Sequence, residues 1–186
     1  MADWDERYRQ GSHASESPNQ LLITALGGLH PGRALDIACG AGRHAIYLAS
    51  KGWQVTAIDR SSVGLEIARK RAAERQLSIE TIEADLELHT FKIAVDSYDL
   101  ICVFYYLQRD LFASIQAGLR RNGTFVGAIH IVDDEPNAHP MNPEFLLNPG
   151  ELKDIFSKWD IKLYREGRWA GSEHNHRDAE IIARKP

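Results

Sequence analysis

The sequence lacks the features that mark several large classes of protein. Its 186 residues contain only two cysteines, Cys39 and Cys102, which are too few for a disulfide framework or a zinc ribbon, so a reducing cytoplasm is the expected location. The longest apolar run, residues 100–107, is too short to cross a bilayer. Residues 1–12 are charged and polar, unlike the apolar core of a signal peptide. We therefore expect no membrane partner.

An excess of positive charge is also absent. The formal net charge is −4 at pH 7 and the isoelectric point is about 6.1, which argues against nucleic acid as a partner. The one basic run, residues 68–76, carries its charges on the helix face opposite Leu65, Ala68 and Ala72, so we interpret it as a solvated surface. With 44% hydrophobic and 26% charged residues, the chain is expected to fold as a single globular domain over residues 1–186.

Strand and helix signals alternate along the chain. Strands are expected at 33–38, 53–59, 78–84, 98–106, 124–132, 160–167 and 178–185, and helices at 19–29, 42–50, 63–76, 111–121 and 150–159, with a loop at 133–149. This alternation predicts βαβ units, and hence an α/β fold in which helices cover both faces of a mostly parallel sheet. The last two strands are separated only by a loop and should form an antiparallel hairpin at one edge. In such sheets a ligand binds beyond the carboxyl ends of the strands.

A glycine turn follows the first expected strand. Gly40, Gly42 and Ala45 fit the pattern G-x-G-x-x-A, and Asp59 follows at the distance of a ribose-binding acid, so an NAD(P)-dependent dehydrogenase is one interpretation. Asp36 favours another, because a carboxylate inside the strand before the turn would repel a pyrophosphate. S-adenosylmethionine has a cationic amino-acid end and no phosphate, so the same carboxylate would attract it.

The other strand ends offer groups for the rest of such a ligand. Asp59 can accept both ribose hydroxyls, Asp85 can accept from the adenine amino group, and Leu86 can donate its backbone N–H to a ring nitrogen. Arg60 would pack against the adenine ring, and Val103 would lie beside the methionine portion. No metal is expected in this site. The candidate cofactor-binding residues are Asp36, Gly40, Gly42, Arg43, Asp59, Arg60, Asp85, Leu86 and Val103.

Four stretches, residues 35–72, 84–87, 98–109 and 122–130, resemble the class I S-adenosylmethionine-dependent methyltransferases, and within them the small tellurite-resistance and thiopurine-methyltransferase-like group. Supporting details are Gly-Arg-His directly after the turn, the opening WDERY, and PEFLLNPGELKDIF before the hairpin. The resemblance implies a three-layer Rossmann-like sandwich with strand order 3-2-1-4-5-7-6 and an antiparallel last strand. It also implies S-adenosylmethionine as cofactor and methyl transfer as the reaction. The sequence departs from many relatives at Ala38, where they carry glycine.

The methyl acceptor is expected to be a small molecule, because no appended domain is present to hold a polymer. Candidate substrate residues are Trp4, Tyr8, Tyr105 and Arg109. Tyr106 and His130 are less favoured candidates for the same pocket. The first two belong to residues 1–20, which lack an apolar stripe before Leu21. We interpret this segment either as an N-terminal lid over the cofactor or as a frayed terminus.

The loop of the closing hairpin, residues 165–178, gathers positive charge. Arg168, His176 and Arg177 are the candidate catalytic residues: if this loop reaches the site, they would bind a small anion, which gives a chalcogen oxyanion or a thiol as the expected acceptor. The alternative is a solvated hairpin tip. His174 and His176 form an H-x-H pattern without a third ligand at a suitable spacing. Besides a methyltransferase and a dehydrogenase, the third functional alternative is a non-catalytic protein that binds S-adenosylmethionine. No feature of the sequence assigns an oligomeric state.

Overall fold

The computed structural model describes residues 4–11, 15–133, 141–168 and 176–186. They contain a seven-stranded sheet in the order β3-β2-β1-β4-β5-β7-β6, which is the predicted order. All neighbours among β1 to β5 are parallel, and β7 is antiparallel to both β5 and β6. The strands are β1 (Arg33–Ile37), β2 (Gln54–Asp59), β3 (Glu80–Glu83), β4 (Tyr98–Phe104), β5 (Leu119–His130), β6 (Asp160–Gly167) and β7 (Asp178–Arg184).

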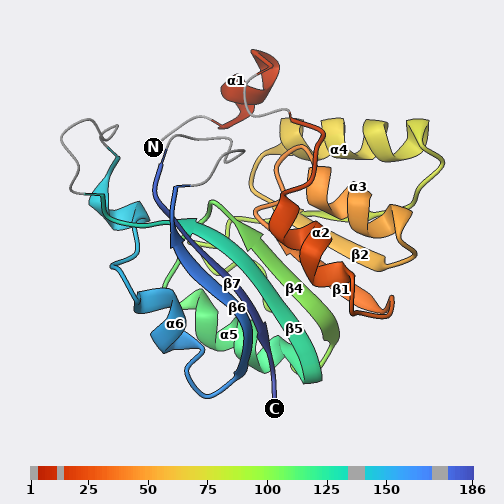
Figure 1. Ribbon diagram of the computed structural model, residues 1–186. Helices are drawn as coiled ribbons and strands as arrows, with labels where there is room; N and C mark the ends of the chain where they lie inside the picture. The colour runs from red at the N-terminus through yellow and green to blue at the C-terminus, as the bar shows by residue number, and fades with distance from the viewer. Residues whose placement is uncertain (1–3, 12–14, 134–140, 169–175) are drawn as a thin grey trace.

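Helices cover both faces of this sheet and make the three predicted layers (Figure 1). Helices α2 (Gln20–Leu26), α3 (Arg43–Ser50) and α4 (Ser62–Glu74) pack on one face, and α5 (Leu111–Gly118) and α6 (Glu151–Ile155) pack on the other. Side chains of successive strand residues point to opposite faces. Ala34 therefore packs in the core on the side of α2, α3 and α4, and Leu35 packs in the core on the side of α5 and α6. The short helix α1 (Trp4–Arg9) belongs to neither layer and lies beside α4.

The boundary between α5 and β5 differs from the sequence prediction. The expected helix at 111–121 ends at Gly118, and the chain passes directly into β5 at Leu119, which is fully buried and pairs with Tyr98. Asn122 (φ 64°) and Gly123, which directly follow the expected helix, lie inside β5 where the register with β4 shifts. Burial of Leu119 in the sheet outweighs the helical pattern of the segment.

Smaller differences occur elsewhere. The expected helix at 150–159 is shorter, since α6 ends at Ile155, and the expected loop at 133–149 contains a 3₁₀ turn, η1 (Pro143–Phe145). Helix α1 lies in a segment for which no helix was predicted. Among the residues that the structure describes, no helix is long and apolar enough to cross a membrane.

Candidate active site

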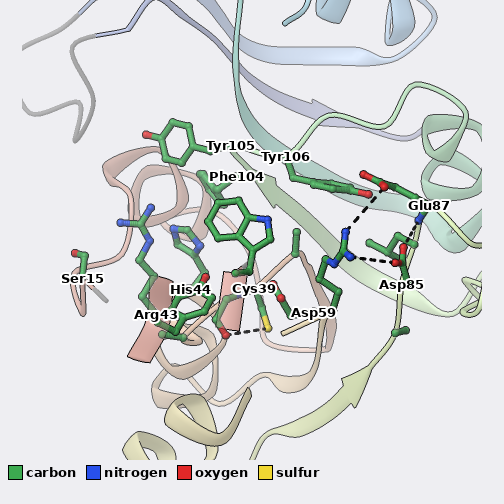
Figure 2. A pocket seen from close by; sticks show the side chains of 18 of the residues that line it. Ser15, Cys39, Arg43, His44, Asp59, Asp85, Glu87, Phe104, Tyr105 and Tyr106 are labelled. Atoms are coloured by element: carbon green, nitrogen blue, oxygen red, sulfur yellow. Dashed lines mark hydrogen bonds and ion pairs between the residues drawn. The ribbon is translucent and has the colours of Figure 1, made fainter. Parts of the chain in front are cut away.

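A cavity of about 700 Å³ opens at the carboxyl ends of β1, β2 and β4 and is bounded by α1. Its volume is typical of small-molecule sites. Arg43 and His44 lie at one end, Asp85 and Glu87 at the other, and Asp59 between them (Figure 2). The wall includes the following residues selected from the sequence: Trp4, Tyr8, Gly40, Arg43, Asp59, Arg60, Asp85, Leu86 and Tyr105.

The turn between β1 and α3 uses backbone conformations that favour glycine. Gly40 and Gly42 have φ values of 53° and 78°. A Cβ atom on Gly42 would lie 2.6 Å from the Cβ of Ala68, so glycine is also needed for the start of α3 to pack against α4. Gly42 does not line the cavity, and its role is to shape the turn. Ala38, the position at which the sequence departs from many relatives, has a φ of 54°, so this chain holds an alanine in a left-handed conformation.

Asp59 joins the turn after β1 to the turn after β2. Its Oδ2 accepts a hydrogen bond from the Gly40 amide at 2.7 Å, and its Oδ1 accepts one from the Ser61 amide at 2.8 Å. Burial raises the pKa of Asp59, while these amide donors act in the opposite direction. Because a carboxylate has about four lone-pair positions and the amide donors do not fill them all, Asp59 can still accept a hydrogen bond from a ligand hydroxyl.

Asp36 does not reach the cavity, contrary to the expectation that it would meet the ligand. It is 1% exposed, its Oδ2 accepts from the Ala45 amide at 3.0 Å, and the Cys102 thiol donates to its Oδ1 at 3.4 Å. Burial raises its pKa to about 7, against smaller lowering effects of these two donors. Asp36 therefore acts on the site by fixing the first turn of α3, and its charge does not decide between ligands. Val103 is also packed in the core and does not line the cavity.

Asp85 and Arg60 form the far end of the cavity. Oδ1 of Asp85 accepts from the backbone amide of Glu87 at 3.0 Å. The guanidinium of Arg60 lies 3.6 Å from Oδ2 of Asp85 and 4.0 Å from the carboxylate of Glu87. The backbone of Leu86 lies between the two acids, and this residue lines the cavity. The far end thus offers carboxylate acceptors and a planar cation to a ligand.

Aromatic side chains that follow β4 line the cavity (Figure 2). They are Phe104 and Tyr106, in addition to the predicted Tyr105. The ring of Phe104 stacks on the imidazole of His44 with centroids 4.0 Å apart, and burial lowers the pKa of His44, which keeps it neutral. Sequence reasoning missed His44, and its place in the first turn of α3, directly after the glycine turn, is the signal that could have found it.

A buried polar cluster lies behind Tyr105. Asn19 donates to the hydroxyl of Tyr105 at 3.0 Å, and the ring of Tyr105 stacks on that of His130 at 5.0 Å. Nδ1 of His130 lies 2.5 Å from Oδ1 of Asp178, a fully buried residue. Within the described part of the chain, Oδ2 of Asp178 has no hydrogen-bond partner. The ring of His176 lies 5.0 Å from that of His130. Sequence reasoning missed Asp178.

Arg109 lies outside the cavity, although it was selected as a substrate residue. Its Nε is 2.6 Å from one carboxylate oxygen of Glu151, and its Nη2 donates to the other at 3.0 Å and to the carbonyl of Leu146 at 2.9 Å. The hydrogen bonds to Glu151 raise the pKa of Arg109 and lower that of Glu151. This bidentate pair joins the loop before α5 to the start of α6, so the structure gives Arg109 a position in the scaffold.

The arginines of the closing hairpin are ion-paired and do not line the cavity. Arg168 pairs with Asp133, and Nη2 of Arg177 lies 3.9 Å from a carboxylate oxygen of Glu166. These acids, of which Glu166 belongs to the loop itself and Asp133 to a distant segment, offset the positive patch expected from the sequence. His176 is the member of the trio that contacts the cluster behind Tyr105. The tip of the hairpin, including His174, lies outside the described residues.

A family model described as tellurite resistance protein TehB matches residues 5–180 of this chain. A curated relative, a probable S-adenosyl-L-methionine-dependent methyltransferase TehB of Haemophilus influenzae, is 28% identical over 147 residues, which are 74% of this chain and 49% of that protein. The chain therefore spans about half the length of this relative.

Two solved structures share the fold. TehB from Haemophilus influenzae matches with a TM-score of 0.79 and 21% identity, covering 98% of this chain and 67% of that one. A 1,6-didemethyltoxoflavin-N1-methyltransferase of Burkholderia thailandensis, with 1,6-didemethyltoxoflavin and S-adenosylhomocysteine bound, matches with a TM-score of 0.73 and 16% identity, covering 98% of this chain and 85% of that one. These likenesses establish the architecture around the cavity.

Proposed function

Because the chain belongs to the family of the tellurite resistance protein TehB, we propose that it transfers a methyl group from S-adenosylmethionine to a small acceptor. The membership confirms the resemblance drawn from the sequence, which was to class I methyltransferases of the tellurite-resistance group. S-adenosylmethionine is the cofactor of this group, and the family match favours it over the dinucleotide of a dehydrogenase.

The observation that carries this proposal is the order of groups along the cavity. The glycine turn with Arg43 occupies one end, Asp59 the middle, and Asp85 with Leu86 the other end. That order matches the cofactor, whose amino acid, ribose and adenine follow one another. In this assignment Arg43 faces the carboxylate of the amino acid, Asp59 accepts from the ribose hydroxyls, and Asp85 faces the adenine.

The reaction asks little of the protein beyond binding and orientation. S-adenosylmethionine, when bound, supplies a methyl carbon activated by its sulfonium. The rings of Phe104 and Tyr105 form the wall against which a sulfonium would be placed, and aromatic faces attract cations. The same rings exclude water from the reacting atoms, so the chain's main contribution is to align an acceptor with the methyl group.

We place the acceptor on the side of Tyr105, where the cluster of His130, Asp178 and His176 lies. The buried pair of His130 and Asp178 orients one imidazole, and His176 brings a second from the hairpin. Imidazoles can take a proton from a thiol or from a protonated oxyanion near neutral pH. This supports a chalcogen oxyanion or a thiol as the acceptor class.

Asp178→Asn tests this placement. The amide keeps the size of the side chain but removes the charge that orients His130, so kcat/KM for the acceptor should fall by about ten-fold or more. The dissociation constant of S-adenosylmethionine should stay within about three-fold of wild type, a difference under 1 kcal/mol. Steady-state kinetics and calorimetry measure the two effects. Glu180→Gln is the matched control, since Glu180 is a buried acid of the same strand whose partner is Arg165. An equal loss in both variants would assign Asp178 a purely structural role.

The activity itself is tested by incubating the protein with S-adenosylmethionine and a panel of tellurite, selenite and small thiols. S-adenosylhomocysteine formation that depends on one of these acceptors is the expected result. If the cofactor binds but no acceptor yields S-adenosylhomocysteine, the chain is a non-catalytic binding protein and the proposal fails.

A further inference from the structure

We propose that α1 is a removable wall of the cofactor site, that Tyr8 is a cofactor-contact residue, and that Asp5 and Glu16 hold this wall closed. The inference rests on the proposed function, because it concerns the exchange of the cofactor. It also moves Tyr8, selected from the sequence as a substrate residue, to the cofactor side of the cavity. Three sets of contacts between the N-terminal segment and the rest of the chain carry it.

The first contact is a cap on α4. Oδ1 of Asp5 accepts from the hydroxyl of Ser61 at 2.6 Å and from the amide of Val63 at 3.3 Å, and Oδ2 lies 3.4 Å from the hydroxyl of Ser62. The carboxylate therefore meets the amino end of α4, where the helix dipole favours a negative charge. The hydrogen bond from Ser61 lowers the pKa of Asp5, so the carboxylate stays charged around neutral pH. Asp5 thus completes a cap that α4 shares with its own Ser61.

The second contact is the side chain of Tyr8, which fills a space left by two glycines. A Cβ atom on Gly40 would lie 2.1 Å from the hydroxyl oxygen of Tyr8, and one on Gly64 would lie 3.0 Å from its ring. Gly40 belongs to the turn that faces the cofactor, and Gly64 lies in the first turn of α4. Tyr8 is 9% exposed and lines the cavity. Its hydroxyl is therefore built against the same backbone that would receive the cofactor.

The third contact lies further along the segment. A carboxylate oxygen of Glu16 is 2.5 Å from Nη2 of Arg75, and the other is 3.5 Å from Nε of Arg71. Arg71 belongs to α4 and Arg75 directly follows its last residue, so α4 holds the segment near each of its ends, at Asp5 and at Glu16. Gly11 and Ser15, which lie between these two anchors, also line the cavity. The segment is thus attached to one helix while it borders the mouth of the cavity.

Such a wall can open because its helix depends on contacts with the rest of the chain. A six-residue helix is too short to be stable by itself in water, so α1 persists only while its side chains are anchored. The Glu16 pairs are exposed and contribute weakly, and are weakened further by salt. We expect S-adenosylhomocysteine to leave only when Asp5 and Tyr8 leave α4 and the glycine turn, so the anchors set the rate of product release.

The test compares the double variant Asp5→Asn, Glu16→Gln with the control double variant Glu66→Gln, Glu74→Gln. Both remove two negative charges, but the control acids lie on α4 itself, outside these contacts. Stopped-flow fluorescence would give the dissociation rate of S-adenosylhomocysteine, and amide hydrogen exchange would report on residues 4–9. The anchor variant should release S-adenosylhomocysteine about five- to ten-fold faster, the scale of one net intramolecular hydrogen bond, and should lose protection in α1. The control should match wild type in both measurements.

Tyr8→Ala and Tyr8→Phe separate the ring from the hydroxyl. Tyr8→Ala should accelerate release at least as much as the anchor variant, and Tyr8→Phe should retain most of the wild-type rate, because the ring fills the space between the glycines. Tighter binding by Tyr8→Ala would mean that Tyr8 occupies the cofactor's place, and would overturn the proposal. Wild-type release rates in both the anchor variant and Tyr8→Ala would overturn it too. Failure of the wild-type protein to bind S-adenosylhomocysteine at all would instead refute the proposed function.

Discussion

Asp59→Asn is expected to weaken S-adenosylmethionine binding by about ten- to a hundred-fold, the effect of losing 1.5–3 kcal/mol of charged hydrogen bonds. The carboxylate holds the amide of Gly40 and the amide of Ser61, one with each oxygen. An asparagine can serve one of these donors with its carbonyl oxygen, but its amino group faces the other. The substitution therefore weakens the link between the two turns and removes the acceptor proposed for the ribose.

Calorimetric titration measures this effect, and Glu83→Gln is the matched control. Glu83 is an exposed acid that pairs in register with Asp59 on the neighbouring strand but does not line the cavity. The control should bind S-adenosylmethionine as wild type does. Equal affinities of Asp59→Asn and wild type would remove Asp59 from the cofactor site.

Asp36→Asn is expected to change how stability depends on pH. Burial raises the pKa of Asp36 from 3.8 to about 7, so folding favours its neutral form. A raised folded-state pKa gives a contribution that is complete below the unfolded pKa and is lost as pH rises through the folded pKa. Between about pH 4 and pH 7 the wild type should therefore lose about 1.4 kcal/mol per pH unit relative to the variant, and on the order of 4 kcal/mol in total.

Urea unfolding at several pH values between 4 and 8 measures this difference. The difference in unfolding free energy between wild type and Asp36→Asn should change by about 1.4 kcal/mol per pH unit below about pH 7 and stay constant above it. Cys102→Ser is a useful second variant, because a hydroxyl is a stronger hydrogen-bond donor to Asp36 than the thiol. It should lower the folded-state pKa of Asp36, so that the stability difference stops changing at a lower pH. A difference that stays constant across the range would show that folding does not raise the pKa of Asp36.

The sheet and the cofactor side of the cavity were accessible from the sequence because their signals are local. The glycine turn directly follows the first buried strand, and an acid stands at the end of β2 or shortly after β3, so each signal lies within a few residues of a strand end. The carboxyl ends of parallel strands meet at one edge, so residues such as Asp59 and Asp85 could be brought together by topology alone. The strand order came with the family resemblance.

Other features depend on contacts between residues far apart in the sequence. Asp178 meets His130 only through the register of β5 with β7, and no local pattern marks it. The cap that Asp5 places on α4 joins residues more than fifty positions apart. Arg168 and Arg177 looked like a cationic patch because the sequence does not show that Asp133 folds against Arg168, or that Glu166 of the same loop turns toward Arg177. Asp36 was assigned the right neighbourhood but the wrong partners, since its oxygens turn toward α3 and Cys102.

The central claim is that this cavity binds S-adenosylmethionine, and one calorimetric experiment tests it most directly. The protein is titrated in parallel with S-adenosylhomocysteine and with NAD, and the S-adenosylhomocysteine titration is repeated with Asp59→Asn. We predict one S-adenosylhomocysteine site per chain, a ten-fold or greater loss in the variant on the scale given above for about 1.5 kcal/mol, and no heat of binding with NAD. Binding of NAD in place of S-adenosylhomocysteine would contradict the account and return the chain to the dehydrogenase interpretation.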